Sequence, residues 1–230
     1  MSTAQNDAAA SRIGGWFARR TPWQRRGIAL VAGAIATLGH APVQIAPFYI
    51  AAIIVLVWLL DRSAAQPRKF KSAFAIGWFF ALGHLTTGLY WISSAFLVDS
   101  QEWGPLWGIP ATLALAGGLA MFWGLGCALA MALWTRDVRR IAVFAACLFV
   151  TEWLRGNILT GLPWLLPGYI WTPGEPISQL ASVFGIYGLT LVTLLVAPAP
   201  AAMADSRDGG AMRFMPTIVA ALALGMSWGW

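Results

Sequence analysis

Charged residues are scarce in this chain of 230 residues. Asp, Glu, Lys and Arg make up only 10% of it, whereas soluble domains average about 25%. Apolar residues account for 59%, and a soluble domain of this length would lack the polar surface needed to stay in water. The composition excludes a cytosolic globular enzyme, a nucleic-acid-binding protein and a disordered chain. The mean hydropathy of +0.68 indicates an integral membrane protein.

Cysteine and histidine are almost missing, with two residues of each. Cys127 and Cys147 lie in long apolar runs, so we interpret them as small buried hydrophobes and exclude a disulfide framework or a cysteine nucleophile. We interpret His40 and His84 as hydrogen-bonded packing residues, with a proton relay as the alternative. The sequence also lacks a Ser/His/Asp set, clustered metal ligands and a phosphate-binding glycine loop. We therefore predict no catalytic residue, metal or cofactor in this chain.

Seven long apolar runs are present, and each predicts a membrane span. A helix needs about 20 residues to cross a hydrocarbon core of about 30 Å, so the first two runs are short. Pro42 lies between them, and Pro47 lies near the start of the second. We expect these two to form a tight helical pair, either spanning or partly re-entrant. The predicted fold is all-α, a polytopic transmembrane helix bundle of about seven spans after a basic cytoplasmic segment at 1–26. The predicted spans are 27–38, 45–60, 72–98, 106–134, 141–154, 177–202 and 214–230, with the sixth bent near Pro198 and Pro200.

Basic residues alternate between successive loops. They gather in the N-terminal segment and at 61–71, 135–140 and 203–213, while the loops between these hold almost none. The positive-inside rule then places the N-terminus in the cytoplasm and the Trp230 end in the periplasm. Because the last run ends without a polar flank, we interpret it as a chain cut before a further, non-cytoplasmic domain. The loops predicted to lie outside are 39–44, 99–105 and 156–176.

The fourth apolar run carries small residues at every fourth position. This spacing lets helix backbones approach closely inside lipid. We predict a central packing helix, with a substrate groove on the same face as the alternative. The residues are Ala116, Ala120, Gly124 and Ala128.

Glu152 and Arg155 are the sharpest polar feature of the apolar part. Three positions apart on a helix, their side chains face each other, and pairing offsets the cost of about 2.5–3.5 kcal/mol for a lone charge at the bilayer centre. We predict a structural ion pair that pins the outer loop. The alternative is a contact to a lipid phosphate or a substrate head group, since Arg matches phosphate geometry. The candidate substrate-binding residues on the outer face are Glu152, Arg155, Gly161, Pro163, Trp164 and Tyr169.

Three segments carry a specific pattern: LGHAP–x–x–x–x–PF at 38–48, GWFFALGHLTTGLYWI at 77–92, and TEWLRGNILTGLPWLLPGY at 151–169, followed by 185–189. In these segments the sequence resembles the bacterial apolipoprotein N-acyltransferase family, and the resemblance covers nearly the whole chain. It implies seven spans followed by a large periplasmic carbon–nitrogen-hydrolase domain and then a final span. That domain, which holds the family's Glu/Lys/Cys catalytic set, is absent from this chain.

The resemblance implies transfer of an acyl chain from a phospholipid to the α-amino group of a diacylglyceryl-cysteine, the last step of lipoprotein maturation, in the bacterial inner membrane. The implied partners are a phospholipid acyl donor, a diacylglyceryl apolipoprotein acceptor and membrane lipids, with no nucleic acid, and we expect a monomer. We expect the chain alone to be inactive because the catalytic set has no counterpart in it. A small multi-span transporter, which would need an ionisable pathway or an internal repeat, and a non-enzymatic membrane scaffold are the alternatives.

The substrates of such an enzyme are lipids, and this constrains the site. Moving a ~16-carbon chain into water would cost on the order of 12 kcal/mol. The acyl chains must therefore stay among the spans, and the site must open sideways to the bilayer. We expect the outer ends of the third and fifth spans, with the loop 156–176, to form this opening.

Overall fold

The structure is a computed structural model that describes residues 15–17, 19–97, 104–135, 137–158, 161–204 and 214–227. Over these ranges every regular element is a helix and none is a strand, which confirms the all-α prediction. The long helices are α2 (Pro22–Ala36), α3 (Ala46–Ala64), α4 (Lys69–Gly88), α5 (Gly104–Ala130), α6 (Arg139–Asn157), α7 (Leu180–Val196) and α8 (Met215–Ser227). The short 3-10 helices are η1 (Thr37–Gly39), η2 (Tyr90–Leu97), η3 (Pro167–Ile170), η4 (Pro176–Gln179) and η5 (Ala199–Ala204).

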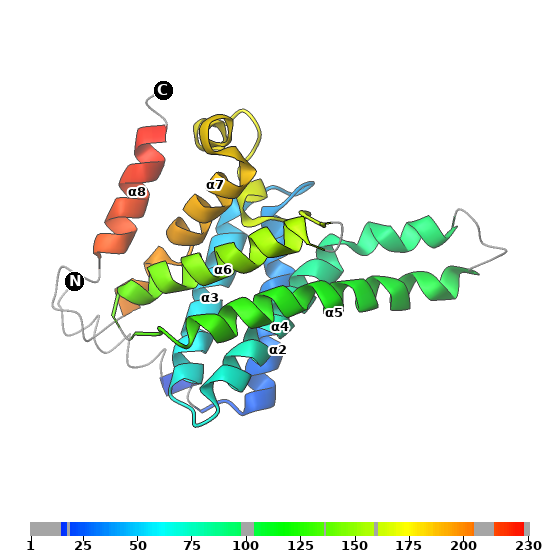
Figure 1. Cartoon of the computed structure of the whole chain (residues 1–230), viewed down its shortest axis with the longest axis horizontal. Helices are drawn as coiled ribbons and strands as arrows, with labels where there is room; N and C mark the ends of the chain where they lie inside the picture. Colours follow the sequence, from blue (N-terminus) through cyan, green and yellow to red (C-terminus); the bar gives the residue numbers. More distant parts are fainter. Residues whose placement is uncertain are drawn as a thin grey trace.

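Helix α4 lies in the middle of the bundle. It packs against α2 and α3 on one side and along α5 on the other, and α6 and then α7 follow beyond α5 (Figure 1). Buried apolar side chains from α2 to α6 form one continuous core. The loop between α3 and α4 lies at one end of this bundle, and the segment after η1 lies at the other end, beside the loop between α6 and α7 (Figure 1).

Each of the seven predicted runs corresponds to a helix or a broken helix. Three segments are long and apolar enough to cross a membrane, namely Ala46–Ala64, Leu106–Ala130 and Pro176–Met203, and the bent pair Lys69–Gly88 and Tyr90–Phe96 makes a fourth if it counts as one span. These segments support the membrane-helix character of the chain. The runs that became α2, α6 and α8 do not reach that length and hydropathy within the described residues, so their crossing stays a prediction.

Two of the long segments are broken. The third run bends by 54° between α4 and η2. The sixth run changes from α7, which ends at Val196, to the 3-10 helix η5 around Pro198, because proline cannot donate the helical N–H. It has a second, unpredicted break at Gly185, whose φ of +68° lies in the left-handed region that glycine adopts without strain.

The small residues of the fourth run are buried or half-buried in the bundle. Ala116, Ala120 and Gly124 are buried, and Ala128 is half-buried. A Cβ at Gly124 would lie 2.9 Å from Cε2 of Phe74 on α4, so a larger residue there would require the Phe74 ring to move. This part of α5 therefore packs closely against α4.

Helices α2 and α4 come very close to each other at two glycines, a contact that was not predicted from the sequence. A Cβ at Gly33 would overlap the carbonyl oxygen of Phe80, and one at Gly83 would overlap the carbonyl oxygen of Leu30. At each glycine, the missing side chain leaves room for the backbone of the opposite helix. Ala29 and Gly33 show the same four-residue spacing that drew attention to α5, so this signal was available.

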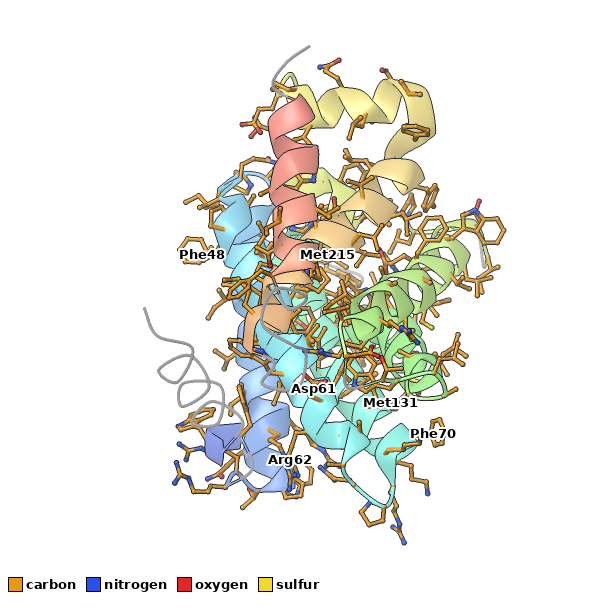
Figure 2. All side chains as sticks on the ribbon, turned by 90° about the vertical axis from the view of Figure 1, so that its left-hand side faces the viewer. Phe48, Asp61, Arg62, Phe70, Met131 and Met215 are labelled. Carbon is orange, nitrogen blue, oxygen red and sulfur yellow. The ribbon has the colours of Figure 1, made fainter. Side chains whose placement is uncertain are left out.

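Polar side chains join the helices at the end where the loop between α3 and α4 lies. The Arg140 guanidinium on α6 lies 3.1 Å from the carboxylate of Asp61 on α3, and the Trp134 indole donates to the same carboxylate. Lys69 donates to the carbonyl of Met131 at 3.1 Å. Figure 2 shows Asp61 and Met131 toward this end, with Arg62 beyond them and Phe48, at the start of α3, toward the other end.

Candidate functional site: an aromatic groove

A groove of about 900 Å³ opens at the end of the bundle opposite the loop between α3 and α4. Its lining comes from four segments that are distant in sequence, within residues 40–44, 88–91, 164–174 and 178–189. They contribute the turn after η1, the bend between α4 and η2, the loop between α6 and α7, and the start of α7. A volume in this range is typical of sites for ligands of drug size.

Aromatic side chains form the rim of the groove. The rings of Trp91 and Trp164 lie with centroids 4.9 Å apart, so the bend after α4 and the long loop meet there. Trp91, Trp164 and Tyr169 each remain 40–47% exposed. Burial raises the pKa of the Tyr169 hydroxyl, with a further contribution from Tyr187, so this phenol stays neutral. Such side chains present an apolar face and a polar edge, which suits the boundary between acyl chains and head groups.

The loop that carries Trp164 and Tyr169 is tied to the helices around it by hydrogen bonds along its length. These bonds come from the turn after η1, from α6 and from α7, so the loop has a fixed shape. The bonds are Arg155 Nη1 to the Leu162 carbonyl at 2.7 Å, His40 Nε2 to the Leu166 carbonyl at 3.2 Å, Gln44 Nε2 to the Tyr169 carbonyl at 2.9 Å, the Gly168 N–H to Thr190 Oγ1 at 3.3 Å, and Trp171 Nε1 to Thr193 Oγ1 at 2.8 Å.

Glu152 and Arg155 form a bidentate ion pair in the protein interior. Arg155 Nε and Nη2 donate to the two carboxylate oxygens at 2.9 and 2.6 Å, and the Trp123 indole donates to the same carboxylate at 2.7 Å. Glu152 is fully buried and Arg155 is 2% exposed. Because Arg155 also donates to the Leu162 carbonyl, the geometry supports the interpretation that the pair pins the outer loop.

The six candidate substrate-binding residues separate into two groups. Only Trp164 and Tyr169 line the groove, whereas Glu152 and Arg155 lie beneath the loop. Gly161, with φ of +74°, makes the turn that returns the chain toward α6, and Pro163 lies near the position that a Cβ at Gly156 would take. The substrate-binding role of all six stays a prediction, and the groove supports it for two of them.

The lining of the groove differs in one wall from the opening expected from the sequence. The end of the third run and the loop 156–176 contribute as expected, but the other wall comes from the sixth run, since no α6 residue is part of the lining. Gln44 was missed as well, because it contacts a carbonyl 125 residues away. No group of three or more His, Cys, Asp or Glu side chains that could hold a metal occurs within the described ranges.

Comparison with known proteins gives the family. A family model described as the apolipoprotein N-acyltransferase N-terminal domain matches residues 32–199. The chain belongs to the apolipoprotein N-acyltransferase family. The resemblance stated above is thereby confirmed, and all four segments of the groove lie inside the matched region.

Relatives that carry the name apolipoprotein N-acyltransferase are much longer than the part they share with this chain. The Rhodopseudomonas palustris protein is 41% identical over 218 residues, which is 94% of this chain and 40% of that protein. The Caulobacter vibrioides protein is 41% identical over 194 residues, or 84% of this chain and 36% of that protein. The chain thus spans 40% or less of these two relatives.

Proposed function

We propose that this chain is the membrane portion of an apolipoprotein N-acyltransferase. In this proposal the enzyme moves an acyl chain from a phospholipid to the α-amino group of a diacylglyceryl-cysteine during lipoprotein maturation. The observation that carries it is the groove of about 900 Å³, lined by aromatic residues and held by a tethered loop, inside the region that defines the family. The groove holds acyl chains beside the bilayer, so the substrates need not enter water.

The topology belongs to the same proposal. Seven crossings, with the N-terminus in the cytoplasm of a bacterial inner membrane, place the groove on the periplasmic side. The ion pair of Asp61 and Arg140 then lies on the cytoplasmic side, near most of the basic loops. The acyl-transfer chemistry belongs to a carbon–nitrogen-hydrolase domain that is not in this chain, and we expect a monomer.

Replacing Trp164 with alanine in a complete enzyme of this sequence is expected to lower kcat/KM for transfer to a diacylglyceryl lipopeptide by about tenfold, equivalent to ~1.4 kcal/mol of lost transition-state stabilisation. The physical reason is that Trp164 supplies apolar contact area at the groove rim. The measurement is acyl transfer from phospholipid in mixed micelles or proteoliposomes at equal enzyme concentrations.

The matched control is Trp153→Ala, because Trp153 is 47% exposed on α6 and does not line the groove. This variant should transfer acyl chains at the wild-type rate. The chain of 230 residues alone is expected to give no transfer in the same assay. Equal transfer rates for wild type and Trp164→Ala at normal protein levels would show that the groove has no part in the reaction. Transfer by the chain of 230 residues alone would show that the catalytic residues lie within this chain.

A further inference from the structure

A second groove, of about 540 Å³, lies along the outer surface of α2, and we call it the α2 groove. Its lining comes from the segment before α2, from one face of α2 and from Val55 of α3. It shares no lining residue with the aromatic groove. Trp16 and Arg20 line the α2 groove just before α2 starts, which places its polar end beside the loop between α3 and α4, far from the aromatic groove (Figure 1).

The rest of the α2 groove has largely apolar walls. Ile28, Val31 and Ile35 follow one another at three- and four-residue steps, so they lie on one face of α2. Val31 and Ile35 are 58% and 41% exposed. Val55 lies midway along Ala46–Ala64, which is long and apolar enough to cross a membrane. The groove therefore reaches from one end of the bundle to the middle of a membrane span, a depth of about one leaflet, or ~15 Å of hydrocarbon.

The polar end of the α2 groove carries positive charge. The Arg20 guanidinium stacks over the Trp16 ring, 4.3 Å from its centroid. Residues 8–60, which include every lining residue, contain no Asp or Glu. Among the residues that the structure describes, no carboxylate forms an ion pair with Arg20. The groove thus combines an apolar channel with a cation at its mouth, and this pattern is complementary to a lipid whose head group is negative.

We propose that the α2 groove binds an anionic phospholipid, with an acyl chain along α2 and the phosphate at Arg20. A guanidinium forms charge-assisted hydrogen bonds that match phosphate geometry. The Trp16 ring suits the boundary between head groups and acyl chains. Basic residues near the membrane surface attract anionic lipids, so charge complementarity selects an anionic lipid over a zwitterionic one.

This lipid is separate from the acyl donor of the proposed function. It lies in the leaflet on the side of the loop between α3 and α4, whereas the aromatic groove opens at the other end of the bundle. In the topology proposed above, its leaflet is the cytoplasmic one. The lipid contacts α2 and α3 together, so it stabilises their packing. This role does not depend on acyl transfer, and its test measures no transfer.

Native mass spectrometry of the purified, delipidated chain in detergent micelles measures the binding. The probes are phosphatidylglycerol and phosphatidylcholine with the same acyl chains, because they differ in net charge and not in their apolar part. We expect one phosphatidylglycerol to bind about fivefold more tightly than phosphatidylcholine, equivalent to about 1 kcal/mol for one basic residue at the membrane surface. Arg20→Gln should abolish this preference, and Arg20→Lys should retain most of it because the charge remains.

The matched control is Arg19→Gln, because Arg19 is exposed and does not line the α2 groove. This variant loses the same charge as Arg20→Gln and should keep the preference for phosphatidylglycerol. Equal binding of the two lipids by wild type would overturn the proposal. An equal loss of preference in Arg19→Gln and Arg20→Gln would also overturn it, because only a general attraction to basic residues would then remain.

Thermal unfolding in the same micelles tests the other occupants of this surface. Phosphatidylglycerol should raise the Tm, as a ligand of the folded state does, and inorganic phosphate at the same concentration should leave it unchanged. An equal rise with inorganic phosphate would assign the site to phosphate alone. A lipid-free dimer that Arg20→Gln dissociates would assign the surface to a second copy of the chain. Either result would contradict the proposal.

Discussion

Replacing Arg155 with methionine will lower the free energy of unfolding by about 3–5 kcal/mol, because the Glu152 carboxylate is then left buried without its cation. Glu152 is fully buried and receives two bonds from Arg155 and one from Trp123. The variant also removes the hydrogen bond from Arg155 to the Leu162 carbonyl, which is the first of the bonds that hold the loop between α6 and α7. The measurement is reversible unfolding of the purified protein in mixed micelles, with loop exposure followed by limited proteolysis.

The chain supplies its own control for this prediction. Asp137 and Arg139 form an exposed pair at 3.9 Å, with the Arg139 side chain 82% exposed. Exposed pairs contribute about 0–1 kcal/mol, so Arg139→Met should hardly change stability. The double variant Glu152→Gln with Arg155→Met should recover most of the free energy of unfolding that Arg155→Met loses, since it leaves no buried charge. Similar small effects for Arg155→Met and Arg139→Met would show that the interior pair does not hold the loop.

Replacing Gly33 with valine is expected to cost about 3 kcal/mol of folding free energy or to prevent stable expression. Overpacking of a core costs about 1–3 kcal/mol and occasionally more, and here the new Cβ would overlap the Phe80 carbonyl oxygen. Backbone cannot move aside as a flexible side chain can, so α2 and α4 must separate. This separation also disturbs His84, whose backbone N–H lies 3.1 Å from the same Cβ position.

Gly27→Val is the matched control on the same helix. A Cβ at Gly27 meets no atom within 4 Å, so this variant should stay within about 0.5 kcal/mol of wild type. Thermal unfolding in one detergent, with expression levels compared in membranes, measures both variants. If Gly33→Val is as stable as Gly27→Val, the close crossing of α2 and α4 is wrong.

The sequence predicts the helical elements well because their signal is local. Apolar runs between basic loops located every long helix, and the three-residue spacing of Glu152 and Arg155 predicted an ion pair whose full burial the structure adds. Prolines at 198 and 200 marked the end of α7, whereas the break at Gly185 required its backbone angle.

Neither the groove nor the contact of His40 with Tyr49 and His84 could be predicted from local sequence patterns. Trp164 and Tyr169 were found because the loop around them is rich in Gly, Pro and Trp. Gln44 donates to the Tyr169 carbonyl from a segment 125 residues away in the sequence, so no local pattern joins the two residues. Tyr49 lies in an apolar run where one hydroxyl gives no pattern, so its meeting with His40 and His84 is visible only in three dimensions.

The central claim is that the aromatic groove opens on the periplasmic side of the membrane. Single-cysteine labelling tests it directly, in a background with alanine at the buried free cysteines Cys127 and Cys147. Glu175→Cys reports the exposed loop beside the groove, and Ala65→Cys reports the exposed loop between α3 and α4. We predict that a membrane-impermeant maleimide labels position 175 in intact cells and position 65 only after permeabilisation. The reverse pattern would put the groove in the cytoplasm and contradict the account.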